Sequence, residues 1–90
     1  MSEENGDQLG SAEVCKRVGI SSRQLEYWVL IGIVAPRQEP HGQKVFKRFS
    51  IHDIEILKEV KSLTDMGFLV SRALEKVRKD HPELFTDAKA

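Results

Sequence analysis

Ser21, Ser22, Arg23 and Gln24 place hydroxyl, guanidinium and amide groups at successive positions of the chain. An arginine binds a phosphate or a guanine through two parallel hydrogen bonds, and a glutamine binds an adenine in the same way. Serine hydroxyls cap helices or donate to phosphate oxygens. These groups are suited to holding a nucleic acid rather than to transforming a substrate.

Basic side chains surround this run, although the 90-residue chain has a formal net charge of zero. Residues 11–48 contain seven basic and three acidic side chains, a net charge of +4. Local charge governs phosphate affinity more than total charge does. Scattered surface charge is the alternative interpretation, and charge alone does not exclude it. The basic residues of this half are Lys16, Arg17, Arg23, Arg37, Lys44, Lys47 and Arg48.

The chain shows no constellation typical of catalysis or metal binding. His41, His52 and His81 are far apart and lack ligand spacing. The sequence contains no phosphate loop and no Ser/His/Asp or Cys/His set that so small a domain could enclose. We therefore expect no enzyme, no catalytic residue, no metal and no other cofactor. Cys15, the single cysteine, is expected to be a small buried apolar residue.

The composition is that of one soluble globular domain, with 40% hydrophobic and 31% charged residues. The longest apolar run, residues 28–35, is much shorter than the roughly 20 residues that span a bilayer. The N-terminus is acidic and polar, unlike a signal peptide. A lone cysteine fits a reducing compartment. We expect a cytoplasmic protein without a membrane partner.

Apolar residues at helical spacing predict two helices that position the first candidate groups. Ser11 is the expected N-cap of a short helix that ends at Gly19. Ser21 or Ser22 caps the second helix, which we expect Gly32 to end in a left-handed conformation. The expected inward face of this second helix consists of Leu25, Trp28, Val29 and Gly32.

Residues 33–49 change to a β-favouring pattern and predict a hairpin with a basic return strand. Residues 41–43 form its expected tip, and Pro40 restricts its strand to a sheet edge. Ser50 and Asp53 then have the spacing of a capping box, which opens a third helix that breaks at Gly67. A fourth helix is predicted from about residue 70 to residue 79.

The predicted fold is mainly α: a winged helix-turn-helix, with a β-hairpin wing and two further helices. Its expected domains are a disordered acidic arm over residues 1–9, a winged-helix DNA-binding domain over residues 10–79 and a short polar tail over residues 80–90. In this order the chain resembles the N-terminal DNA-binding domain of the MerR family of bacterial transcription regulators. The segments that carry the resemblance are Cys15 to Ser21, Arg23 to Trp28, Ile31 to Pro36, Lys47 to Ile54 and Met66 to Phe68.

The resemblance implies that the second helix enters the major groove of double-stranded DNA while the wing follows the flanking backbone or the minor groove. Arg23 and Tyr27 would hold the backbone, and RNA polymerase is a partner by family analogy. The candidate DNA contacts are Lys16, Arg17, Ser21, Ser22, Arg23, Gln24, Tyr27, Arg37, Lys44, Lys47 and Arg48.

The sequence departs from the family pattern at the wing, in the second helix and at the tail. The segment between Gly42 and Lys47 is longer, and Val29 and Leu30 replace a usually acidic pair. The tail after Lys79 is short and acidic where the family continues into a long dimerising helix. Dimerisation therefore stays open, and we expect either the reader of a longer protein or a stand-alone adaptor.

Two alternative functions fit parts of the sequence. An architectural factor resembling the phage excisionases would bend DNA with a related winged fold. A protein-interaction module would use the same fold without DNA, and Leu30, expected to face outward from the second helix, motivates this reading.

Overall fold

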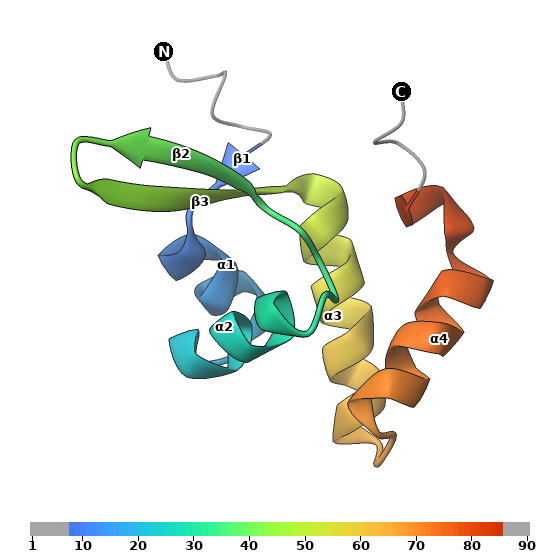
Figure 1. Ribbon diagram of the computed structural model, residues 1–90. Helices are drawn as coiled ribbons and strands as arrows, with labels where there is room; N and C mark the ends of the chain where they lie inside the picture. The colour runs from blue at the N-terminus through green and yellow to red at the C-terminus, as the bar shows by residue number, and fades with distance from the viewer. Residues whose placement is uncertain (1–7, 86–90) are drawn as a thin grey trace.

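The computed structural model describes residues 8–85, in which four α-helices, a three-stranded antiparallel sheet and a short 3-10 helix form one domain (Figure 1). The predicted winged helix-turn-helix is confirmed. The elements in chain order are β1 (Gln8–Leu9), α1 (Ser11–Val18), α2 (Ser22–Leu30), β2 (Arg37–His41), β3 (Lys44–Ser50), α3 (Ile51–Asp65), α4 (Val70–Asp80) and η2 (Pro82–Phe85).

The helix-turn-helix consists of α1 and α2. The N-cap of α1 is Gly10 and not Ser11 as predicted: Gly10 keeps the extended conformation of β1, and its carbonyl accepts the first helical bond from Val14 N at 3.0 Å. Gly19 ends α1 with a φ of 85°, in the left-handed region that favours glycine. The chain then turns, and Ser21 caps α2.

Gly32 ends the helix-turn-helix with a φ of 90°, as predicted, so an L side chain would be strained there. The hairpin pattern was expected to begin at residue 33, but residues 33–36 are not a strand. Ile33 and Val34 are buried instead and belong to the hydrophobic core. Their β-branched side chains therefore serve packing rather than strand pairing.

The wing consists of β2 and β3, whose hairpin projects beyond the helices (Figure 1). The sheet order is β1-β3-β2, so β2 is an edge strand and tolerates Pro40. Gly42 and Gln43 form the two-residue turn between His41 and Lys44, and Gly42 has a φ of 65°. A positive φ at the first turn residue is typical of a hairpin turn that matches the strand twist.

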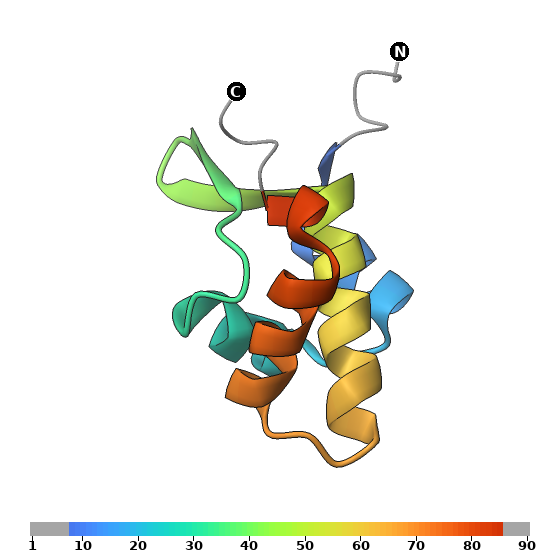
Figure 2. The same ribbon diagram turned by 90° about the vertical axis from the view of Figure 1, so that its right-hand side faces the viewer.

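The helix α3 begins with the predicted capping box. Ser50 Oγ accepts from Asp53 N, and the Asp53 carboxylate accepts from Ser50 N, both at 3.0 Å. Figures 1 and 2 show α3 running away from the end of β3 and α4 returning beside it. A short polar tail was predicted for residues 80–90, but residues 82–85 of it form η2. Leu84 and Phe85 of this 3-10 helix pack against the core.

One hydrophobic core connects the helix-turn-helix to α3, α4 and the root of the wing. Leu57 and Val60 of α3 are fully buried at its centre, and Trp28 of α2 is only 1% exposed. Phe49 is the single buried residue of the hairpin strands. The rest of the wing lacks a core of its own, so its stability depends on cross-strand contacts.

Candidate nucleic-acid interface

The first turn of α2 is fixed by Ser21. Its Oγ accepts from Gln24 N at 3.0 Å, the usual geometry of an N-cap. This bond gives Ser21 a structural role in addition to any contact with a ligand. Ser22, Arg23 and Gln24 are exposed in the same turn.

Arg23 and Tyr27 lie one helical turn apart and are both exposed, with Tyr27 53% accessible. Within residues 8–85, Arg23 makes no ion pair. Trp28 next to Tyr27 is buried, as predicted, and anchors the helix from behind. The structure therefore presents an unneutralised guanidinium and an aromatic hydroxyl on one surface of a well-anchored helix.

The two candidate cations of α1 differ in their surroundings. Arg17 Nε donates to Glu13 at 3.0 Å, an i,i+4 pair on the surface of the helix. Lys16 is exposed and, in the part of the chain that the structure describes, has no ion-pair partner. An exposed pair of this kind contributes little stability, so Arg17 can exchange its partner at low cost.

The hairpin register divides the wing cations between two faces. Residues that oppose each other in an antiparallel ladder share a face, and Arg37 pairs with Arg48 while His41 pairs with Lys44. Arg37, Lys44 and Arg48 therefore lie on one face. Lys47 pairs with Gln38 and lies on the other face, so the four wing cations predicted from sequence do not form a single surface.

Glu39 binds two of these cations, which the sequence analysis did not predict. Its carboxylate accepts from Arg48 Nε at 3.1 Å and from Arg37 Nη2 at 3.2 Å, and His41 Nε2 lies 3.5 Å away. The hydrogen bond from Arg48, followed by those from His41 and Arg37, lowers the pKa of Glu39. The spacing of Arg37, Glu39 and His41, each two residues apart in a predicted strand, was the sequence signal that could have placed these three side chains on one face.

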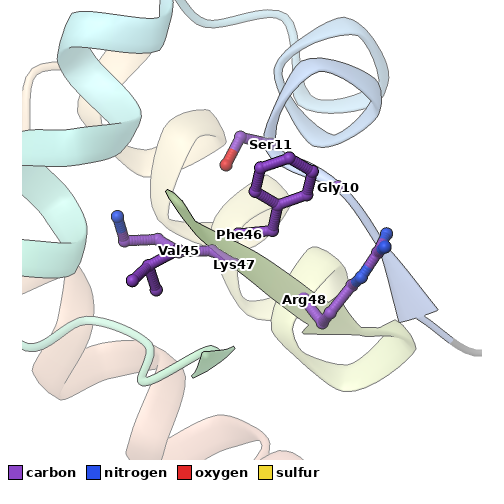
Figure 3. A pocket seen from close by; sticks show the side chains of 6 residues that line it. All are labelled: Gly10, Ser11, Val45, Phe46, Lys47 and Arg48. Carbon is purple, nitrogen blue, oxygen red and sulfur yellow. The ribbon is translucent and has the colours of Figure 1, made fainter. Parts of the chain in front are cut away.

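A shallow cavity of about 250 Å³ lies between the wing and the beginning of α1. Figure 3 shows Phe46 pointing toward Ser11, whereas Val45 and Lys47 leave β3 on the opposite side. Arg48 extends along Gly10, where an added Cβ would be 3.9 Å from its guanidinium. Phe46 also packs against His41, with ring centroids 5.3 Å apart.

The outward orientation expected for Leu30 is confirmed, since this side chain is 82% exposed at the end of α2. A groove of about 480 Å³ lies nearby, between the C-terminal half of α2 and the beginning of α4. Tyr27, Ile31 and Leu74 contribute to its lining, so Tyr27 belongs to both the candidate DNA surface and this groove.

Burial raises the pKa of the Cys15 thiol, and the nearby Glu26 raises it further. Cys15 is half-buried and packs against the core.

Among residues 8–85, no group of three or more His, Cys, Asp and Glu side chains has an arrangement that could hold a metal ion. None of the helices found in that range is long and apolar enough to cross a membrane.

Two of the elements that carry candidate groups lie on one side of the molecule. The beginning of α2 and the tip of the hairpin both lie on the side away from α4 (Figure 1). A helix-turn-helix followed by a projecting hairpin defines the winged helix-turn-helix class of DNA-binding proteins.

The chain matches the MerR HTH family of regulatory proteins over residues 10–79 and belongs to this family. No individual curated protein matched the chain. The family is one of regulatory DNA-binding proteins and not of enzymes, so the chain has the role of a DNA-binding transcription regulator.

Proposed function

We propose that the first turn of α2 enters the major groove of double-stranded DNA and that the wing follows the flanking backbone or minor groove. The observation that carries this proposal is Arg23, exposed beside Gln24 on a helix end that Ser21 caps. The N-terminal amides of a helix and a nearby guanidinium both favour phosphate oxygens. Gln24 is the side chain best suited to read a base, because its amide can bind adenine bidentately.

The remaining candidate contacts extend the proposed interface on either side of α2. Lys16 and Arg17 approach phosphates from α1, and Tyr27 donates its hydroxyl to the backbone one turn after Arg23. Lys44 at the hairpin tip and Lys47 supply charge from the wing, together with Arg37 and Arg48. Ser22 donates a hydrogen bond from its hydroxyl to the DNA backbone. The Ser21 oxygen accepts from Gln24 N as the N-cap, and its hydroxyl proton remains for a phosphate.

Replacing Arg23 with alanine tests this proposal. We expect the full chain to bind a mixed-sequence DNA duplex at low salt, and the Arg23→Ala variant to bind roughly tenfold or more weakly, because it loses a charged phosphate contact. Arg72→Ala is the matched control, since Arg72 is also an exposed helical arginine but lies on α4. Fluorescence anisotropy over a salt series measures both variants.

An NMR titration with the same duplex maps the contact surface. Shifts confined to residues 16–27 and 37–48 would support the proposed interface. Equal affinities of the Arg23→Ala and Arg72→Ala variants, or shifts centred on α4, would contradict it.

A second candidate function uses the groove beside Leu30 for a protein partner. The observations that favour it are the 82% exposed Leu30 at the end of α2 and a groove to which the next residue, Ile31, contributes. If Arg23→Ala left DNA binding unchanged while Leu30→Asp abolished the association with a partner, this function would replace the first.

Family membership suggests further partners that belong to the same proposal. RNA polymerase is the expected partner of a promoter-bound regulator of this kind, and a second copy of the protein would supply a second DNA half-site. Action on chromosomal DNA is also the basis for expecting the protein in the cytoplasm.

A further inference from the structure

Two arginines of the wing, Arg37 and Arg48, face each other directly across the hairpin, and we refer to them as the wing arginine pair. Directly opposed residues of an antiparallel ladder leave the same face of the sheet. Like charges in such positions repel and weaken strand pairing. An anion that binds both guanidinium groups therefore stabilises this part of the wing.

The carboxylate of Glu39 supplies that anion from within the chain. One oxygen accepts from Arg48 Nε at 3.1 Å, and the other accepts from Arg37 Nη2 at 3.2 Å. His41 Nε2 lies 3.5 Å from the oxygen that binds Arg48. Glu39 thus uses both oxygens to bind the wing arginine pair, and its single negative charge offsets one of the two positive charges.

The Arg37–Glu39 bond is exposed and the Arg48–Glu39 bond is half-buried, so competing anions can reach the contact from the solvent side. The side chains of Arg37, Arg48 and Glu39 are 63%, 34% and 33% exposed. Exposed ion pairs are weak, since water and salt screen them. Phe46, which opposes Glu39 on this face, is also substantially exposed, so no buried wall closes over the carboxylate.

We propose that the wing arginine pair is a site for a DNA backbone phosphate and that Glu39 occupies it as an internal competitor. This inference rests on the proposed function, in which the wing follows the DNA backbone. A phosphodiester carries one negative charge and two acceptor oxygens, which match the two donors that Glu39 now engages. Binding exchanges the carboxylate for the phosphate, and Glu39 returns to water.

This exchange makes Glu39 a residue that weakens DNA binding. Each phosphate contact must displace an existing ion pair, so the net gain from Arg37 and Arg48 is smaller than that from an unpaired cation. Lys44, at the end of the same face, has no ion pair within the described range and meets no such competition. The wing therefore contains two arginines for which Glu39 competes with DNA and a lysine for which it does not.

Removing the negative charge of Glu39 tests the inference. The full chain and its Glu39→Gln variant are titrated into a mixed-sequence DNA duplex of about 30 base pairs over a salt series. We expect the variant to bind about threefold to tenfold more tightly at low salt, with a plot of log affinity against log salt that is steeper by up to about 0.9, the value of one phosphate contact.

The matched control is Glu75→Gln, which removes the same charge from an exposed position of α4. We expect this control to stay within about twofold of the unaltered chain. In a chain that carries Arg37→Gln and Arg48→Gln, the further Glu39→Gln change should give no gain beyond that of the control, because no pair remains to be released.

Several results would overturn the inference. Glu39→Gln binding no tighter than Glu75→Gln, or weaker than the unaltered chain, would mean that Glu39 supports the wing rather than competes with DNA. If Arg23→Ala still reduced binding in that case, the proposed function would stand and only this inference would fall. No binding by the unaltered chain would remove both.

A second measurement avoids substitution of Glu39, whose loss could loosen the hairpin. The Glu39 carboxyl carbon and the Arg48 Nε–H group of the unaltered chain are followed by NMR as the duplex is added near neutral pH. Displacement predicts that both signals shift at saturation while the carboxyl carbon of Glu75 does not. Unshifted Glu39 and Arg48 signals would overturn the inference independently of any variant.

Discussion

Arg23 and Arg48 carry the same charge in different electrostatic surroundings. Arg23 has no ion pair among the residues that the structure describes, whereas Arg48 binds the carboxylate of Glu39. The sequence predicted both as candidate contacts because residue type alone sets the charge. It did not predict the difference, since the Arg48–Glu39 contact depends on a hairpin register that brings residues nine positions apart together.

A pH titration of the Glu39 carboxyl group should reveal a lowered pKa. Bonds from Arg48, His41 and Arg37 stabilise the ionised form and lower its pKa below the ordinary value of about 4.3. A depressed pKa in the folded state means that the ion pairs support the wing at neutral pH and are lost only as the pH falls through that lowered value. NMR of the carboxyl carbon measures it.

Arg48→Gln provides the comparison for that titration, because it removes the hydrogen bond that lowers the pKa of Glu39 most. We expect the pKa of Glu39 to rise in this variant. A pKa of Glu39 at or above the ordinary value in the unaltered chain, or one insensitive to Arg48→Gln, would contradict the assignment of these contacts.

At the scale of elements, the beginning of α3 was predictable because its signal is local. The capping box of Ser50 and Asp53 lies within four residues, and both of its hydrogen bonds are present. The N-cap of α1 was one residue off because Gly10, directly after β1, keeps an extended conformation, and only pairing with β3 produces β1. A cap that depends on a distant strand has no complete local signal.

Loss of the α3 cap should have a measurable effect on stability. Ser50→Ala removes the acceptor for Asp53 N and leaves that amide without its partner, so we expect the free energy of unfolding to fall by about 1 kcal/mol. Urea denaturation followed by far-ultraviolet circular dichroism measures the change.

Ser62→Ala is the control for the cap, since Ser62 is exposed within α3. Alanine has the higher helix propensity, so this variant should be as stable as the unaltered chain or slightly more stable. Equal losses in the two variants would show that the Ser50 hydroxyl does not act as a cap.

At the scale of the molecule, α3 joins the parts of the domain. It contacts α1, β3, α4 and η2, and Leu57 at its centre is fully buried. Leu57→Ala should therefore lower the free energy of unfolding of the whole domain by about 2–5 kcal/mol, the range for truncation of a buried leucine. This is a large part of the stability that a domain of this size possesses.

Trp28, the single tryptophan, reports this loss from a different helix. Its fluorescence emission and the helical circular dichroism signal should follow the same urea transition in the unaltered chain and in Leu57→Ala, because one core joins α2 to α3. Lys58→Ala, at the exposed neighbouring position, should change stability little. Separate transitions would mean that the helix-turn-helix and α3 unfold as independent units.

By itself, the sequence determined the four helices, the hairpin, their order along the chain and the candidate DNA contacts of α2, but neither β1 nor η2. These follow from periodicity, caps and turn glycines, which act within a few residues of the chain. Arg23, Gln24 and Tyr27 could be singled out because one helix and its N-cap position them.

Only the tertiary structure decided which wing cations share a face, that Glu39 binds both Arg37 and Arg48, and that Leu84 and Phe85 pack on the core. These contacts join residues that are distant along the chain and that a hairpin turn or the packing of helices brings together. Strand register and helix packing set them, and neither is encoded at a single position of the sequence.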